Sequence, residues 1–503
     1  MTAGQLALVA TLAVPAGGAA ATALIPAGRE AAARLTGTAA AAVAFLASVL
    51  LVLGGRDAGW FAYAPALPRV RPWHAVRADW APGLDLSFHL GVDGISYPLV
   101  VLTTLLTLLC CAYTTQRAPA GGRASRLIAL LLVVEVGILG TFLALDLVLF
   151  FVFFEVVLLP MYAVIAIWGG PQRRAAARKF VLYTLFGSVL LLVGVFTVVA
   201  AAGTADLVAL TGGDQLGRGV QLGAFTLFAL AFAVKAPLWP LHTWLPDAHT
   251  EAPTVGSVIL AGVLLKMGTY GLIRIGVGVT PEGAAWAAPV LGVLAVAAIL
   301  VGALVCLAQT ELKRLIAYSS VGHMGFVLLG IATLTTTGIQ AALIGNIAHG
   351  LITGLLFFLV GAVKERAGTG ELARLGGLRE RAPVLAGVLG FAAIASLGLP
   401  GLAGFWGEIF AVVAAFQRGG AWVVLGVLAA TGAALTAAYF LRLLRRVSHG
   451  EPAPAPAGMA PLARVEVVAW APLVVLTLAV GLLPALVLAV AYDPVTALLG
   501  AAG

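Results

Sequence analysis

Charged residues are scarce in this chain. Only 10% of its 503 residues are Asp, Glu, Lys or Arg, whereas soluble domains average about 25%. Apolar residues make up 61% of the chain. This balance excludes a soluble globular enzyme and indicates a polytopic membrane protein.

Cysteine is almost absent too. The three Cys residues, Cys110, Cys111 and Cys306, all lie within apolar runs. An adjacent pair lacks the spacing of a zinc site or a disulfide framework, and no Cys set could hold an iron–sulfur cluster. No Gly-rich nucleotide motif follows a strand. We therefore expect no metal, no cofactor and no redox active site in this chain, and the Cys residues to serve packing.

A concentrated basic face and a basic leader are both missing. The net charge is +8, but the Lys and Arg residues are scattered over short links, so we expect no nucleic-acid partner. The first 28 residues carry no charge. They lack the basic n-region of a signal peptide, and we expect the first apolar segment to be retained.

Apolar runs long enough to cross a bilayer fill most of the chain. A hydrocarbon core of about 30 Å needs about 20 apolar residues in a helix, and fourteen such runs occur, which predicts an all-α membrane protein. The expected spans are residues 4–25, 35–53, 91–115, 127–144, 147–168, 180–202, 222–245, 254–277, 285–307, 315–334, 339–363, 383–416, 422–444 and 465–490. The longest link, residues 54–90, is too short for a soluble domain, and its Pro and Trp content suits a structured external cap.

The links differ in positive charge. Alternate links lie on opposite sides of the membrane, and one set holds 20 Lys and Arg residues against 6 in the other. The positive-inside rule places the first set in the cytoplasm. Both termini are then expected on the non-cytoplasmic side of a cell inner membrane.

Four charged residues lie deep inside expected spans. They are Glu155, Lys235, Lys266 and Glu408. A charge near the bilayer centre costs roughly 2.5 to 3.5 kcal/mol on insertion scales, so such residues usually face a wet interior and have a function.

The two deep cations are both Lys, although the chain has 24 Arg and 5 Lys. A random draw would give two Lys roughly one time in forty, which suggests that Arg does not serve at these positions. Lys can lose its proton when buried and regain it beside a carboxylate, whereas Arg cannot. The pattern predicts proton carriers. The alternative is that Lys235 and Lys266 form fixed structural ion pairs.

Five further polar residues lie in or near the spans. His323 and His349 occupy neighbouring spans and are either packing groups or relays between Lys and Glu. Glu135 and Asp146 are secondary candidates because they lie less deep or near a span end. Arg274 is near the outer end of its helix, where we expect its side chain to reach water.

Two Pro residues predict discontinuous helices beside buried charges. Pro237 follows Lys235 by two residues and should break the seventh span there. The twelfth span, residues 383–416, is too long for one straight helix, and Pro400 is the expected break, eight residues before Glu408. Irregular backbone at this depth is tolerated where protein or a water-filled cavity covers it, so both breaks favour a polar path.

The breaks also suggest an internal repeat. Lys235 and Glu408 are 173 positions apart, and Glu155 and His323 are 168 apart. Discontinuous helices at corresponding places point to inverted repeats. We expect an N-terminal segment 1–126 with three helices, a first repeat 127–277 with helices 4–8, an inverted second repeat 285–447 with helices 9–13, and a C-terminal helix within 465–503.

Five strings carry a family resemblance. They are Phe150-Phe-Val-Phe-Phe-Glu-Val-Val-Leu-Leu-Pro-Met161, Leu241-His-Thr-Trp-Leu-Pro-Asp-Ala-His249, Gly401-Leu-Ala-Gly-Phe-Trp-Gly-Glu408, Gly91-Val-Asp-Gly-Ile-Ser96 and Lys313-Arg-Leu-Ile-Ala-Tyr-Ser-Ser-Val-Gly-His323. Over about residues 85–445 the chain resembles the antiporter-like membrane subunits of respiratory complex I, the proton-pumping NADH:quinone oxidoreductase. The M type (chain 4) is the nearest, because L-type and N-type subunits tend to have Lys where this chain has Glu408.

The resemblance implies fourteen helices, two inverted five-helix repeats and one proton route. It places the family's Glu–Lys pair on Glu155 and Lys235, its central Lys on Lys266 and its exit-side acid on Glu408. His323 and His349 match the connecting polar axis. Three residues of the second string, His242, Asp247 and His249, suit either a cap at the cytoplasmic mouth or a proton uptake path.

The resemblance further implies that NADH, FMN, the iron–sulfur clusters and quinone belong to partner subunits. The expected partners are other membrane-arm subunits, including neighbouring antiporter-like ones, and the lipid bilayer. The first alternative function is a subunit of a multi-subunit sodium/proton antiporter. Others are a membrane subunit of a hydrogenase or related dehydrogenase, and a scaffold in which nothing moves.

Overall fold

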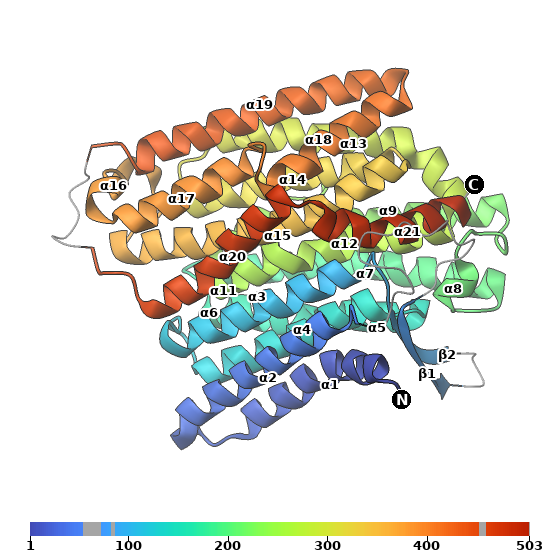
Figure 1. Ribbon diagram of the computed structural model, residues 1–503, viewed down its shortest axis with the longest axis horizontal. Coiled ribbons are helices and arrows are strands. Elements are labelled where there is room, and N and C mark those ends of the chain that lie inside the picture. The colour runs from blue at the N-terminus through green and yellow to red at the C-terminus, as the bar shows by residue number, and fades with distance from the viewer. Residues whose placement is uncertain (54–71, 82–85, 452–458, 502–503) are drawn as a thin grey trace.

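The computed structural model describes residues 1–53, 72–81, 86–451 and 459–501, which fold into a bundle of long helices (Figure 1). In these residues, 13 helical segments are long and apolar enough to cross a membrane. The shorter helices α17 (Pro383–Ser396) and α18 (Ala403–Arg418) together form the remaining span. The expected all-α membrane fold is confirmed.

The helices follow the apolar runs of the sequence. Before residue 254 they are η1 (Ala27–Arg29), α1 (Ala3–Leu24), α2 (Glu30–Leu50), α3 (Tyr97–Gln116), α4 (Ala124–Leu143), α5 (Leu147–Val156), α6 (Leu158–Trp168), α7 (Arg173–Ala202), α8 (Leu207–Leu210), α9 (Arg218–Lys235) and α10 (Trp244–Glu251). After it come α11 (Thr254–Ile259), η3 (Leu260–Leu264), α12 (Leu265–Gly271), η4 (Leu272–Val277), α13 (Pro281–Ala308), α14 (Leu312–Ala332), α15 (Thr336–Ala367), η5 (Leu372–Arg374), α16 (Leu378–Arg381), α19 (Ala421–Val447), α20 (Arg464–Leu482) and α21 (Ala485–Ala501).

A β-hairpin covers one end of the bundle. Strand β1 (His74–Ala81) pairs antiparallel with β2 (Leu86–Val92), with His74 opposite Val92 and an irregularity between Asp79 and Ala81. This hairpin is the described part of the predicted external cap; the link's residues 54–71 and 82–85 lie outside the described residues. Both chain ends and α8 lie at the same end of the bundle as the hairpin (Figure 1).

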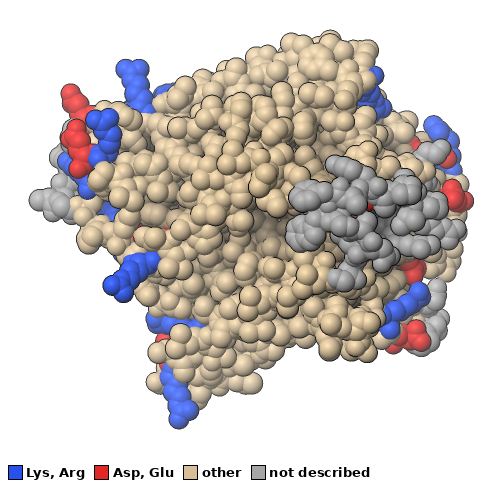
Figure 2. Space-filling view, in the orientation of Figure 1, with Lys and Arg blue, Asp and Glu red and all other residues tan. Residues whose placement is uncertain are grey.

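Two helical segments form the centre of the bundle. Every residue from Val255 to Val277, in the run from α11 to η4, is buried, as is most of α15, whereas only about a third of the residues in α1, α7 and α19 are buried. Figure 1 shows α15 in the middle of the bundle, with α19 and α1 at opposite edges. On the face seen in Figure 2, charged side chains gather at the two ends and leave an uncharged belt between them, as expected for a bilayer.

Both predicted helix breaks are present. Helix α9 ends at Lys235, and the carbonyl of Ala233 accepts a hydrogen bond from the Leu238 N–H instead of continuing the helical ladder. The twelfth span is interrupted between α17 and α18, where Gly398 and Gly401 have φ angles of 79° and 92°. Residues with a Cβ rarely adopt such angles, so glycine allows the chain to turn here.

Two further breaks were not predicted. The fifth span divides into α5 and α6 at Val157, next to Glu155, and Pro160 explains this because its ring clashes with the carbonyl of Val156. The expected single C-terminal helix is also wrong. It divides into α20 and α21 around Pro484, which cannot donate a hydrogen bond to continue α20.

Two isolated β-bridges tie the connecting segments together. Asp146 pairs with Asp206, and Glu311 pairs with Glu371. Each residue of the second bridge lies 165 positions after its counterpart in the first. The flanking hydrogen bonds match as well: Leu147 N–H to Ala205 and Leu207 N–H to Leu145 correspond to Leu312 N–H to Gly370 and Leu372 N–H to Thr310.

Candidate functional site

A line of titratable side chains runs through the bundle interior, from Lys266 on α12 to Glu408 on α18. Lys266 Nζ lies 2.6 Å from His349 Nδ1, and the His349 ring lies 6.0 Å from the His323 ring, centroid to centroid. His323 Nδ1 is 2.9 Å from a Glu408 carboxylate oxygen, and its Nε2 is 2.9 Å from the Ser396 hydroxyl. Four predicted residues, all remote from one another in the sequence, therefore form one polar axis.

A small cavity lies along this axis. Its volume is about 30 Å³, and His323, His349, Ser396 and Glu408 contribute to its lining. A cavity needs about 10 to 15 Å³ of such volume to hold one water molecule, and the water needs polar partners. This cavity meets both conditions, so water can connect the two His rings to Glu408.

The backbone brings Glu408 close to α15 through glycine. A Cβ placed on Gly407 would lie 2.6 Å from the Cα of Gly345 on α15. Any larger residue at 407 would therefore push α18 away from α15. The Gly-rich string before Glu408 thus has a packing reason as well as a conformational one.

Irregular helix positions Lys266 within α12. Two π-helical segments, η3 and η4, flank α12. In a π-helix such as η3, backbone hydrogen bonds join residues five positions apart. The carbonyl of Ala261, in η3, accepts a hydrogen bond of 2.5 Å from Lys266 Nζ. The side chain of Lys266 is fully buried.

The Glu155–Lys235 pair is open in this structure. Glu155 accepts a hydrogen bond from the Ser188 hydroxyl. Lys235 Nζ has no hydrogen-bond partner among the described residues and lies 4.7 Å from the centre of the Phe154 ring.

Buried Arg and buried Lys residues differ in their partners. Arg274 lies 2.5 Å from an Asp93 carboxylate oxygen, and Arg366 lies 2.7 Å from one of Glu466; both cations are 3% exposed in their side chains. Lys235, Lys266 and Lys313 are buried to a similar degree, at most 5% exposed. Within the described part of the chain, none of these three has a carboxylate within the 4.0 Å limit of an ion pair. The Arg residues are neutralised in place, and the Lys residues are not.

The Arg274–Asp93 pair corrects the expectation for Arg274. Its side chain does not reach water, because Asp93, held by the backbone N–H groups of Ile95 and Ser96, meets it inside the bundle. Tyr270 also accepts a hydrogen bond from Arg274. Asp93 stood in one of the quoted strings, but its spacing gave no sign of this partner.

The three candidate residues His242, Asp247 and His249 have different surroundings in the structure. Asp247 forms ion pairs with Lys179 at 2.7 Å and Arg314 at 3.2 Å. His242 packs edge-on against Tyr318, 6.2 Å between ring centres. His249 is fully buried, and neither of its ring nitrogens has a hydrogen-bond partner in the described residues.

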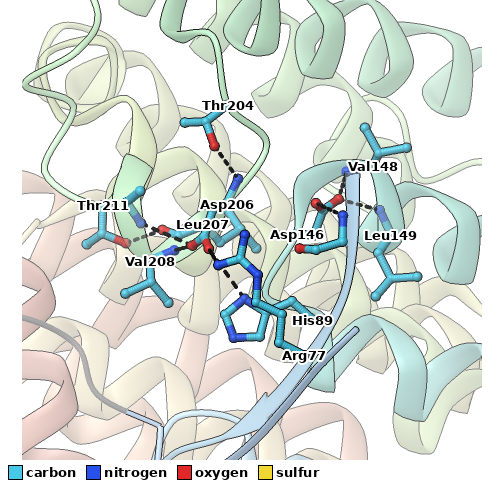
Figure 3. Close-up of polar contacts among 12 residues, drawn as sticks. Arg77, His89, Asp146, Val148, Leu149, Thr204, Asp206, Leu207, Val208 and Thr211 are labelled. Carbon is cyan, nitrogen blue, oxygen red and sulfur yellow. Dashed lines mark hydrogen bonds and ion pairs between the residues drawn. The ribbon is translucent and has the colours of Figure 1, made fainter. Parts of the chain in front are cut away.

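The two secondary acids also differ. Glu135 is fully buried in α4, and both of its carboxylate oxygens lack partners among the residues described. Asp146 instead caps α5, accepting hydrogen bonds from the N–H groups of Val148 and Leu149 (Figure 3). Burial raises the pKa of the Asp146 carboxyl, and the nearby charge of Asp206 adds to this.

Asp206 joins the β-hairpin to the bridge beside α8 (Figure 3). Its carboxylate lies 3.0 Å from Arg77 on β1 and 3.5 Å from His89 on β2, and it caps α8 through the N–H groups of Val208 and Ala209. Burial by itself would raise the pKa of Asp206, but the contact with His89 and the capping N–H groups outweigh it and lower the pKa. Because the folded pKa lies below the unfolded one, Asp206 stabilises the hairpin above its unfolded pKa, and this stabilisation is lost as the pH falls through the folded pKa.

We predict that Asp206→Asn loosens the hairpin. The amide still caps α8 but cannot pair with Arg77 and His89, and partly exposed pairs are worth about 0.2 to 1 kcal/mol. Amide hydrogen exchange of β1 and β2 at neutral pH, corrected for intrinsic rates, should rise about twofold to fivefold. The wild-type protection should fall towards that of the variant below about pH 4, the ordinary range of an Asp. Equal protection of both proteins across this range would contradict the assignment.

Comparisons with known proteins agree with this architecture. Residues 144–436 match the family described as NADH:quinone oxidoreductase/Mrp antiporter, transmembrane. NADH-quinone oxidoreductase subunit M of Rhodobacter capsulatus is 42% identical over 461 residues, covering 89% of this chain and 86% of the relative. NAD(P)H-quinone oxidoreductase chain 4 of a Synechococcus strain is 43% identical over 423 residues, covering 80% and 77%.

Two solved structures share the whole fold. A chain of respiratory complex I from Thermus thermophilus with bound NADH has a TM-score of 0.84 at 31% identity, covering 99% of this chain and 100% of that one. A chain of the Mrp complex from Dietzia sp. has a TM-score of 0.84 at 25% identity, with both chains covered completely. Together with the sequence relatives, these matches show that the chain belongs to the NADH:quinone oxidoreductase/Mrp antiporter family, as an antiporter-like, multi-pass membrane subunit of the M (chain 4) type.

Proposed function

We propose that this chain moves protons across the membrane through its buried polar axis, driven by redox chemistry in partner subunits of an NADH:quinone oxidoreductase. The observation that carries the proposal is the continuous series from Lys266 through His349 and His323 to Glu408. Every member can gain and lose a proton. Residues of the series also line a small cavity that has room for water.

The unpaired state of the buried lysines supports a carrier role. A fixed ion pair keeps its cation charged, as Asp93 does for Arg274. Lys235 and Lys266 have no such partner in the described residues, so their protonation depends on what approaches them. We assign Glu155 as the movable partner: its approach would hold the proton on Lys235, and its withdrawal towards Ser188 would release it.

The proposed order of groups is Glu155 and Lys235, then Lys266, then His349 and His323, then Glu408. His323 is held between Glu408 and Ser396, which orients its ring along the axis. Glu408 serves as the exit-side acid. Asp247 serves as a cap, because two cations already hold it at the surface.

The remaining chemistry belongs to other chains. In this proposal NADH, FMN, the iron–sulfur clusters and quinone are bound by partner subunits, and the membrane partners include neighbouring antiporter-like subunits. The basic links face the cytoplasm, and both termini face the opposite side of the inner membrane. The common position of the termini, the hairpin and α8 at one end of the bundle supports placing both termini on the same side of the membrane (Figure 1).

We further propose that residues 127–277 and 285–447 are inverted repeats, preceded by the segment 1–126 and followed by 465–503. The matching bridges support this, because both partners of the second lie 165 positions after those of the first. The spacing of 165 positions is shorter than the 173 positions between Lys235 and Glu408 and the 168 positions between Glu155 and His323. Insertions near the helix breaks would account for the difference.

Sodium/proton exchange is the second candidate. The Mrp complex chain from Dietzia sp. has the same fold at 25% identity, so fold alone does not choose between the two activities. The higher identities to M-type and chain 4 subunits favour redox-driven pumping. A hydrogenase-like partner and a static scaffold are weaker alternatives, because nothing in the axis explains unpaired lysines in a scaffold.

Lys235 provides the test. We expect Lys235→Ala and Lys235→Arg each to suppress NADH- and quinone-dependent proton pumping, followed by dye quenching in membrane vesicles, while the complex stays assembled. Arg cannot release a proton, so preserving the charge should not preserve pumping. Lys179→Arg, at a side chain 37% exposed and outside the polar axis, is the matched control. Unchanged pumping in Lys235→Arg would sink the carrier hypothesis, and sodium-dependent pumping would favour the antiporter.

A further inference from the structure

A large hollow opens at the end of the bundle opposite the hairpin. Its volume is about 910 Å³, and it lies between the last residues of α3, α6, α10 and α15 and the first residues of α11 and α14. Its polar lining includes Arg117, Glu251, Lys313 and Lys364. Water can therefore reach the bundle interior from this end.

Lys313 lies where this hollow meets the interior. Its side chain is 5% exposed, and its Nζ donates a hydrogen bond to the carbonyl of Ala252, the residue that directly follows α10. The last carbonyls of a helix lack helical partners and accept such donors. No carboxylate in the described residues pairs with Lys313; Glu311 lies 4.0 Å from Lys364 instead.

His249 lies one helical turn before Ala252 on α10. Its ring is fully buried and stacks on Phe357, with 4.6 Å between ring centres and 9° between planes. Both ring nitrogens lack hydrogen-bond partners among the described residues. Leaving a buried polar group unsatisfied costs about 1 to 3 kcal/mol, so such a ring calls for an explanation.

The surroundings of His249 suggest one. Lys313 contacts the carbonyl of Ala252, one helical turn after His249. The His249 ring stacks on Phe357 of α15, the helix that also carries His349, the partner of Lys266. His249 therefore lies next to the group that Lys313 contacts at the hollow and packs against the helix that carries the polar axis. Neither nitrogen is occupied by a structural hydrogen bond, so both are free to exchange protons.

A purely structural role for Lys313 explains less. Elsewhere in this chain a helix end is closed by Arg: Arg418 donates to the carbonyls of Ala332 and Thr333 at the end of α14. The chain has 24 Arg against 5 Lys. A Lys at the end of α10 is thus the less common choice, and it differs from Arg in being able to release its proton.

We propose that Lys313 and His249 form the uptake branch of the proton path, which delivers protons from the hollow to Lys266. This inference rests on the proposed function. The neutral Lys313 amine takes a proton from a hydronium ion in the hollow and leaves water. It passes that proton to one ring nitrogen of His249, whose other nitrogen gives up a proton to the neutral amine of Lys266, so only N–H and O–H bonds change and nothing is oxidised.

The charged groups around this branch come from four elements. They are Glu251 on α10, Glu311 at the start of α14, Lys364 and His349 on α15, and Lys266 on α12. Of these, Glu251 and Lys364 line the hollow together with Lys313. Because the branch takes its protons from water in the hollow, it should deliver them readily when they are abundant and become limiting when they are scarce.

The test uses the assembled complex in membrane vesicles, with Lys313→Met, Lys313→Arg and His249→Gln. Each variant should lower NADH-driven pumping roughly tenfold at about pH 8.5 and distinctly less at about pH 6, because uptake becomes rate-limiting only when protons are scarce. Arg174→Met, at an exposed cation outside the hollow, is the matched control and should behave as wild type. Added imidazole should restore pumping to His249→Gly, because a small base can enter through the hollow.

Three outcomes decide the inference. A pH-dependent loss with imidazole rescue supports it. Full pumping in Lys313→Arg, which keeps the hydrogen bond to Ala252 but cannot release a proton, would overturn it even if Lys313→Met fails to assemble. Lys266→Arg in the same vesicles distinguishes failure of the proposed function from failure of the uptake branch. If Lys266→Arg pumps normally, the proposed function itself fails. If Lys266→Arg loses pumping while the Lys313 variants pump normally, only the uptake branch is refuted.

Discussion

Replacing Lys266 by Arg is expected to abolish proton pumping while the complex remains assembled. Lys266 is fully buried, donates to the Ala261 carbonyl and lies 2.6 Å from His349. An Arg at this position would keep the positive charge permanently, so the proton could not move on to His349. Loss of a positioned proton-transfer group typically costs 10²- to 10⁴-fold in rate, and we expect a loss of at least about 10².

The measurement is the initial rate of dye quenching per molecule of assembled complex, with assembly checked on native gels. Because the larger Arg side chain can strain a packed interior, Lys266→Met provides a second variant without a titratable group. Lys179→Arg controls for the exchange of Lys for Arg itself, since its side chain is 37% exposed and lies outside the axis. Near-normal pumping in both Lys266 variants would show that the proton path avoids this residue.

Glu408→Gln is expected to have the second-largest effect. Gln keeps the size of Glu and can still form a hydrogen bond with His323, now 2.9 Å from the carboxylate, but it cannot bind and release a proton. We expect pumping to fall at least about tenfold, with quinone reduction falling in parallel because the two are coupled. Glu408→Asp should retain part of the activity, since the acid remains but is shorter.

Ser396→Ala separates a positioning effect from an acid-base effect at the same place. It removes the hydroxyl that contacts His323 Nε2 while leaving Glu408 intact. We expect the pumping rate to fall only about twofold. One hydrogen bond contributes about 0.5 to 1.5 kcal/mol, and a twofold fall corresponds to the lower end of that range. If Ser396→Ala were as damaging as Glu408→Gln, the acid would not be the essential group.

The contrast between buried Arg and buried Lys residues connects these predictions. Both types have side chains that are at most 5% exposed, yet Arg274 and Arg366 have carboxylates within 2.7 Å, and the described partners of Lys266 and Lys313 are carbonyls and a His ring. Buried charges without partners are expensive. A neutral amine avoids this cost, which is why only Lys suits an unpaired position that must also be charged at times.

Much of the fold followed from local features of the sequence. Apolar runs predicted the spans because a bilayer selects length and hydropathy. Pro237 and Pro400 predicted two breaks because the missing N–H and the ring clash act within one helical turn. The chain also interrupts its helices near Pro160 and Pro484, but α1, α13 and α20 continue through Pro15, Pro289 and Pro472, so a Pro by itself does not fix a break.

Of the candidate site, the sequence by itself determined which residue types lie deep and roughly at which depth. It did not determine their partners. Only the tertiary structure places Lys266 beside His349, Arg274 beside Asp93 and Glu155 beside Ser188. Only the tertiary structure, too, shows that the ring nitrogens of His249 lack hydrogen-bond partners among the described residues. The reason is geometric. Helical periodicity gives the height of a side chain along its own helix, but contacts between helices 83 or 181 residues apart depend on how those helices rotate and pack against one another.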